Sequence, residues 1–207
     1  MPTKQQYIDT IKDKTKNQFR DRTIALELEI AFNTIVGQLF LKDPYQYDFY
    51  VRWFDDVDVV QADPCLDEKG NGVRRSYSVL PCATIQTPDL ANGVRYILAN
   101  KSNNISDPSE ELRFYPIPAY GVQTYTDLGL DNIDPNTVGY VVYTNRVEYW
   151  NLPTLIEKVR MGVVPSFMAW DNDTEIPLPS GVSAQIITMV LESVQKYPYE
   201  TSDYKND

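Results

Sequence analysis

Apolar residues recur at helical spacing between residues 22 and 41 of this chain. Positions three or four apart are held by Ile24, Leu28, Ala31, Ile35 and Leu39, a repeat that lines one face of an α-helix. Further apolar residues beside this row widen the apolar surface to more than half of the helix circumference. The pattern predicts a long helix that contacts the protein core on one side and a neighbouring subunit on the other.

Two weaker helical patterns lie near the ends of the chain. In residues 4–17 the spacing of Thr3 and Gln6 is that of a capping box, but the segment is too polar to hold as a helix without a partner. Near the other end, Ser180 precedes a one-sided row of apolar residues that stops at Pro198. This second pattern predicts a final helix.

A shorter helix is predicted before it. Residues 154–161 follow Pro153, and proline is favoured at the first position of a helix. Gly162 then stands where a helix C-cap is expected.

The centre of the chain is rich in β-branched and aromatic residues, which is typical of strands. Turn residues such as Asn92-Gly93 separate the apolar runs. Pro116 and Pro118 mark the segment around them as an edge strand or a linker. Strands are predicted over residues 57–62, 74–80, 83–86 and 94–99, followed by a hairpin or long strand over 138–150.

These elements predict an α+β fold. It consists of a long N-terminal helix, a central antiparallel β unit, a short helix, a C-terminal helix and a mobile tail. We expect one domain over residues 20–197, preceded by an N-terminal arm (1–19) and followed by a flexible C-terminal tail (198–207).

Charge is distributed unevenly along the 207 residues. The formal net charge is −10, so the protein as a whole is expected to repel nucleic acid and anionic membranes. Residues 1–22 nevertheless carry six basic and three acidic residues, which suggests contact with an acidic neighbour or with a copy of the same chain. No uninterrupted apolar run approaches the ~18 residues of a membrane span, and no signal peptide is recognisable, so a cytoplasmic origin is expected.

Residue types that carry covalent chemistry are sparse. The chain contains no histidine, its nine glycines form no phosphate-binding loop, and Cys65 and Cys82 are expected to be reduced thiols. Asp171, Asp173 and Glu175 resemble the start of a calcium loop, but the glycine and glutamate that complete it are missing. We therefore expect a protein without catalytic residues, cofactor or metal.

Tyrosine is abundant, with 15 residues, and its large amphipathic side chain suits protein interfaces. Interface residues are predicted on the long helix, in the Tyr-rich loops and strands, and in the tail. They are Ile24, Leu28, Phe32, Tyr120, Tyr125, Tyr143, Tyr149, Trp150, Tyr197 and Tyr199.

Four short patterns follow the long helix in a recognisable order. They are Val-x-Val at 57–59, Tyr-x-x-Leu-Pro at 77–81, Asn-Gly-Val-Arg at 92–95, and Ile-Pro-Leu-Pro-x-Gly leading into an apolar helix at 176–191. Over residues 20–197 this order resembles the neck or ring proteins that crAss-like and related short-tailed bacteriophages stack beneath the portal.

The resemblance implies a non-enzymatic virion structural protein. About twelve copies would form a ring, a head-to-tail connector that joins the portal and capsid to the tail. The β unit would pack side by side around the ring, and the N-terminal helix and C-terminal tail would reach the portal or the next ring or tail protein. DNA would pass through the acidic channel without specific binding, and assembly would take place in the cytoplasm of the bacterial host.

Two alternatives remain open from the residues alone. One is another virion component, such as a tail hub, a head-completion protein or a fibre adaptor, which differs from a ring in its symmetry. The other is a small hydrolase or carbohydrate-binding module, which would use a cleft with converging carboxylates such as Asp55, Asp56 and Asp58.

Overall fold

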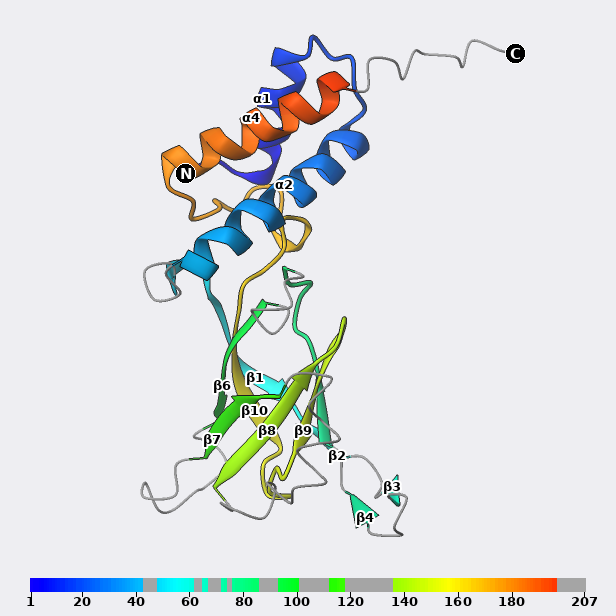
Figure 1. The fold of residues 1–207 in the computed structure, drawn as a ribbon, viewed down its shortest axis with the longest axis vertical. Coiled ribbons are helices and arrows are strands. Elements are labelled where there is room, and N and C mark those ends of the chain that lie inside the picture. Colours follow the sequence, from blue (N-terminus) through cyan, green and yellow to red (C-terminus); the bar gives the residue numbers. More distant parts are fainter. Residues whose placement is uncertain are drawn as a thin grey trace, which may run out of the picture. The chain divides into compact units, whose positions relative to one another are not determined.

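A computed structural model confirms the predicted α+β class (Figure 1). It describes residues 1–42, 48–61, 65–66, 72–73, 76–85, 93–100, 112–117 and 136–196. Contacts divide the chain into two compact units, a helical unit of Met1–Tyr50 with Pro165–Asp207 and a β unit of Val51–Val164. The helical unit is thus built from both ends of the sequence. The predicted boundaries of a single domain stay a prediction, and residues 198–207 lie outside the described residues.

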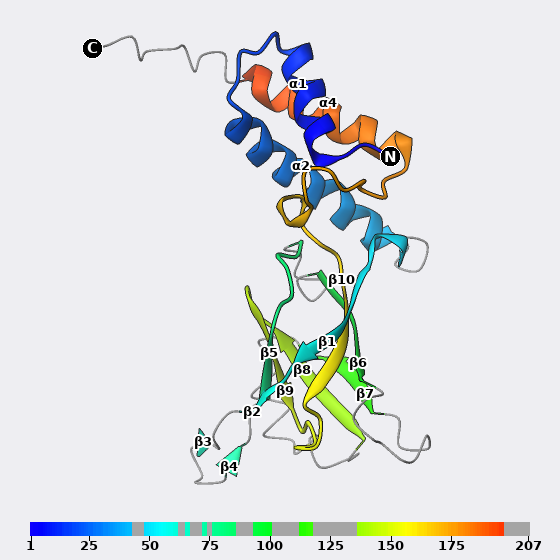
Figure 2. The ribbon, with the colours of Figure 1, turned by 180° about the vertical axis from the view of Figure 1, so that it is seen from behind.

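Three helices form most of the described part of the helical unit. The predicted long helix is confirmed as α2 (Asp21–Lys42), the final helix as α4 (Ser180–Lys196), and the polar N-terminal segment forms α1 (Lys4–Lys14). Two 3₁₀ turns, η1 (Asp48–Tyr50) and η5 (Phe167–Ala169), belong to the same unit. Figure 2 shows α1 and α4 side by side, as in Figure 1.

Residues 1–19, which were predicted to be an arm, pack inside this unit. The capping box of α1 is present, because Thr3 accepts from the Gln6 amide and Gln6 accepts from the Thr3 amide. Tyr7, Ile8 and Ile11 bury the apolar side of α1, and the Tyr7 hydroxyl donates to Ser183 Oγ of α4 at 2.7 Å. Tertiary contact therefore supplies the partner that this polar helix needs.

An aromatic cluster around the buried Phe167 forms the centre of the helical unit. Its ring lies 5.9 Å from that of Tyr7 in an edge-on arrangement and 5.8 Å from that of Phe32. Such aromatic pairs contribute about 0.5–1.5 kcal/mol beyond the burial of area. The segment that follows the β unit is thereby joined to both N-terminal helices.

The β unit contains two main sheets. One has three strands in the order β1 (Arg52–Asp58), β10 (Lys158–Val163) and β6 (Val94–Ala99), all antiparallel. The other has five strands, of which only the β7–β8 pair is parallel. Its order is β2 (Val60–Gln61), β5 (Ser76–Val79), β9 (Arg146–Trp150), β8 (Thr137–Val142) and β7 (Arg113–Pro116). A separate ribbon pairs β3 (Cys65–Leu66) with β4 (Gly72–Val73).

The two main sheets share one hydrophobic core. The three-stranded sheet contributes Val57, Ile97, Val159, Met161 and Val163, and the five-stranded sheet contributes Val138, Tyr140, Val147 and Tyr149. The predicted hairpin at 138–150 is confirmed as β8 and β9, and the proline-containing segment is confirmed as the edge strand β7.

Two elements predicted from the sequence are wrong. The short helix over 154–161 is absent, because Val159, Met161 and Val163 alternate with outward residues in strand β10. The strand over 83–86 does not form at the described residues 83–85, beyond an isolated bridge at Thr84, although the Ile85 amide donates to Val164 O at 3.1 Å. The strand over 57–62 is divided at Val59 between β1 and β2, which belong to different sheets.

Buried tyrosines make the β unit sensitive to alkaline pH. Burial raises the pKa of Tyr140 to about 12, whereas a tyrosine in the unfolded chain ionises near 10. The folded state keeps this proton while the unfolded state loses it, so stability present below pH 10 is lost between about pH 10 and 12.

We expect Tyr140→Phe to weaken this pH dependence. The substitution keeps the ring and removes the ionisable group. Between about pH 10 and 12 the variant should therefore lose about 2–3 kcal/mol less of its free energy of unfolding than the wild type loses. Urea unfolding at a series of pH values measures the difference. Tyr143→Phe, on the exposed hairpin turn, is the control, and identical pH profiles for Tyr140→Phe and wild type would contradict the expectation.

Candidate interaction surfaces

The helical residues predicted to form an interface lie inside the helical unit. Ile24, Leu28 and Phe32 are buried on the side of α2 that forms the core, so they are not available to a partner of the folded chain. The prediction failed to separate the two apolar sides of this helix. The opposite side carries Leu26 and Ile30, whose side chains are 59% and 49% exposed.

We call Leu26 and Ile30 the α2 stripe, because they follow one another at a spacing of one turn. Leu41 is a third exposed apolar residue of α2, three turns further on. By length and composition alone, α2 is also long and apolar enough to cross a membrane, which the sequence did not lead us to expect. Eight of its residues are buried in the helical unit, however, as in a core helix.

The predicted aromatic interface residues have mixed positions. Tyr149 and Trp150 are buried in the β unit, so the prediction that they contact a partner directly does not fit the folded chain. Tyr143 is exposed beside the Arg146 guanidinium, which lies 5.6 Å from its ring centroid. The other four lie outside the described residues: Tyr120, Tyr125, Tyr197 and Tyr199.

The side of the three-stranded sheet that faces away from the core carries an aromatic pair. Trp53 of β1 and Tyr96 of β6 are both paired with Gly162 of the central strand β10, so the three residues form one row across the sheet. The two rings stack over the glycine with an interplanar angle of 10° and centroids 5.4 Å apart. Sequence analysis could not find this arrangement, because Trp53, Tyr96 and Gly162 come from three distant segments.

Charged and apolar side chains extend this row. The Arg160 guanidinium lies 4.5 Å from the centroid of Trp53, and its Nε contacts Asp55 Oδ1 at 2.6 Å. Leu98, paired with Arg160 across the sheet, is exposed. We call Trp53, Tyr96, Leu98, Arg160 and Asp55 the outer face.

A β-bulge determines which residues of β1 belong to the outer face. Between the pairs Phe54–Met161 and Val57–Val159, two residues of β1 lie opposite a single residue of β10. The extra residue turns both Phe54 and Val57 inward and leaves Asp55 and Asp56 on the other side. Asn100 Nδ2 donates to Asp55 O and Asp56 Oδ1 at 2.7 and 2.8 Å, which anchors the bulge to the end of β6.

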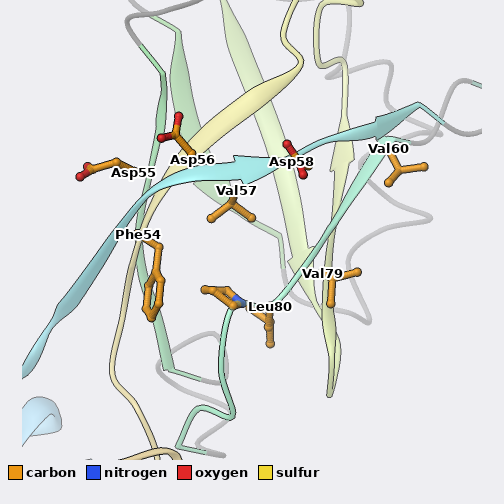
Figure 3. Close-up of a pocket in the computed structure, with 9 residues that line it drawn as sticks. Phe54, Asp55, Asp56, Val57, Asp58, Val60, Val79 and Leu80 are labelled. Carbon is orange, nitrogen blue, oxygen red and sulfur yellow. The ribbon is translucent and has the colours of Figure 1, made fainter. Parts of the chain in front are cut away.

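An open apolar hollow of about 510 Å³ lies on the inner side of β1. Figure 3 shows Phe54, Val57 and Leu80 pointing into this space, whereas Asp55 and Asp56 leave β1 on the opposite side. Val60 and Val79 line its exposed rim. Asp55, Asp56 and Asp58 also border the hollow, but Asp55 and Asp56 point away from Phe54 and Val57. These two carboxylates therefore do not converge in it, as general acid–base chemistry would require.

Within the described residues, no three acidic or cysteine side chains gather where they could hold a metal ion. Asp171 and Asp173 are exposed, and Glu175 contacts the amino group of Met1 at 3.8 Å. Cys82 is a free thiol, and burial raises its pKa, which lowers its reactivity at neutral pH.

The outer face has the composition of a protein-binding surface. Trp, Tyr and Arg dominate the residues that carry binding energy in protein interfaces, and stacking orders these side chains before a partner arrives. The surrounding ion pairs are largely exposed and contribute little to stability.

Comparison of the sequence with protein-family models and with curated proteins found no match.

We expect Gly162→Ala to disrupt the outer face. A Cβ at this position would lie 2.9 Å from Val51 Cγ1, 3.1 Å from Tyr96 Cδ2 and 3.2 Å from Trp53 Cη2. The overpacking should lower the free energy of unfolding by about 1–3 kcal/mol, measured by chemical denaturation.

Gly181→Ala in α4 is the matched control. A Cβ there has open space around it, and alanine favours the helix by about 0.5–1 kcal/mol relative to glycine. Equal effects of the two substitutions would contradict the close packing around Gly162.

Proposed function

We propose that this protein is a non-enzymatic structural subunit of a short-tailed bacteriophage virion. In this proposal about twelve copies form a ring in the neck that joins the portal and capsid to the tail. The partners are neighbouring copies of the chain, the portal, and the adjoining ring or tail proteins, and assembly takes place in the bacterial cytoplasm.

The observation that carries the proposal is the outer face of the β unit. It presents a stacked Trp53–Tyr96 pair, the guanidinium of Arg160 and the exposed Leu98 on one open side of a sheet. A surface of this composition gains binding energy when a second protein excludes water from it. The order of sequence patterns from Val57 to Leu191, which resembles that of ring proteins, supports the same class of function.

Ring closure by identical subunits requires that the outer face meet a different surface of the next copy. Side chains that are ordered before binding, such as the stacked Trp53 and Tyr96, suit such repeated contacts because they lose less conformational entropy. The net charge of −10 favours a channel with an acidic wall, through which DNA slides because like charges repel.

The proposal predicts self-association that depends on the outer face. Native mass spectrometry over a range of concentrations should detect large oligomers of the wild-type chain with a closed maximum near twelve copies. Leu98→Glu would bury an unpaired carboxylate in each contact, which costs about 3 kcal/mol per interface and should shift the population to monomers.

Leu155→Glu is the control, since Leu155 is an exposed leucine of the same β unit outside the outer face. This variant should assemble as the wild type does. A wild-type chain that stays monomeric at every concentration would contradict a self-assembling ring, and equal assembly of both variants would exclude the outer face as the contact.

A further inference from the structure

One end of the helical unit gathers exposed basic residues. They are Lys14 at the end of α1, Lys16 in the following turn, and Arg20 and Arg22 at the start of α2. None of the four makes an ion pair with a residue that the structure describes, whereas the adjacent Lys12 pairs with Asp21. We call these four residues the basic end.

Helix electrostatics account for only part of this cluster. A lysine at the C-terminal end of α1 is favoured by the helix dipole. Arg20 and Arg22 stand instead at the N-terminal end of α2, where the dipole disfavours cations and favours an acid such as Asp21. Their positive charge is therefore unfavourable for the isolated helix, which points to an anionic partner.

Apolar surface continues from the basic end along the same side of α2. Arg22, Leu26 and Ile30 follow one another at intervals of four residues, so they form one row. The row is about 12 Å long, since each residue of a helix rises 1.5 Å. A ligand for it needs both negative charge and apolar or aromatic side chains.

The last turn of α4 lies beside the start of this row. Ser193 Oγ donates to Glu27 Oε2 at 2.6 Å, so the end of α4 at Lys196 is next to the first turns of α2. Figures 1 and 2 both show the red end of α4 beside the blue turn that joins α1 to α2. The chain that follows Lys196 therefore starts at the basic end.

The sequence of this following segment, residues 197–207, is complementary to the row. It contains three acidic residues and one lysine, for a formal charge of −2, together with three tyrosines. Eleven residues span up to roughly 36 Å, three times the length of the row. We propose that the segment 197–207 binds the basic end and the α2 stripe of its own chain, with its carboxylates on the cations and its tyrosines on Leu26 and Ile30.

Tethering makes such a contact effective even if the pairwise affinity is weak. Because the segment is joined covalently to the end of α4, its effective concentration at the site is on the order of 1 mM. A free peptide of this sequence with a dissociation constant of about 0.1 mM would then find the site about nine-tenths occupied in the intact chain. The free peptide should bind about tenfold more weakly to the wild type than to a chain whose own segment cannot compete.

The experiment uses full-length chains at a concentration where each is monomeric. The triple variant Glu200→Gln/Asp203→Asn/Asp207→Asn removes all three acidic side chains of the segment, and a fluorescently labelled peptide of residues 197–207 is titrated by anisotropy. We expect the peptide to bind this variant with a dissociation constant of about 0.1 mM, to bind the wild type about tenfold more weakly, and to lose binding to both as salt is raised. Asp171→Asn/Asp173→Asn, two exposed acids of the same unit, is the matched control and should behave as the wild type.

Two further comparisons locate the site on the triple-variant background. Arg20→Glu/Arg22→Glu should abolish peptide binding, while acids at this helix terminus favour α2, so the loss cannot be ascribed to unfolding. Leu26→Ser should weaken binding more than Leu41→Ser, because both leucines are exposed on α2 and only Leu26 adjoins the basic end.

Equal peptide binding to the wild type and the triple variant would overturn the proposal, as would binding that survives Arg20→Glu/Arg22→Glu. In the wild type, amide shifts of residues 14–30 that change with protein concentration, and do not change in the triple variant, would show that the segment binds a neighbouring copy. This outcome would also overturn the proposal.

The inference does not rest on the proposed ring. Binding is measured on monomers, so a failure of ring assembly leaves its outcome unaffected.

Discussion

Gly162 carries no side chain, and the three-stranded sheet is arranged around that absence. Trp53 and Tyr96 come from strands that flank β10 on either side, and they meet only because nothing rises between them. A methyl group there would lie within 3.2 Å of three side chains. The same strand turns Val159, Met161 and Val163 to the core, so one short segment supports both the interior and the outer face.

Irregular pairing decides which residues reach the surface of this sheet. One bulge falls between Phe54 and Val57, and a second shift falls where Gly162 and Val163 meet β6. Each shift changes the face to which later residues of the strand point. The result is an apolar interior next to an outward cluster of aromatic and charged side chains, an arrangement suited to binding another protein.

The helical unit depends on contacts between distant parts of the sequence. Phe167 follows the β unit in the chain, yet it packs against Tyr7 and Phe32 from the first 50 residues. Glu29 accepts from the Met168 amide at 2.7 Å, and Glu27 accepts from Ser193. These contacts place the end of α4 beside the cationic start of α2, on which the proposed contact with residues 197–207 depends.

Features that depend on neighbouring residues were determined by the sequence alone. They include the length of α2, the capping box of α1, the one-sided row of α4, and the β8–β9 hairpin. Periodicity, capping and turn chemistry act within a few positions, so they can be read without a fold.

Only the tertiary structure decided which side of α2 faces the core, because both sides are apolar and the choice depends on α1, α4 and η5. It also made residues 158–163 a strand, although Pro153 and Gly162 are local signals compatible with a helix. Two flanking strands, from residues 52–58 and 94–99, offered backbone pairing and a core that a helix there would have left unfilled. Packing energy between distant segments outweighs weak local preference, which is why the outer face could not be predicted.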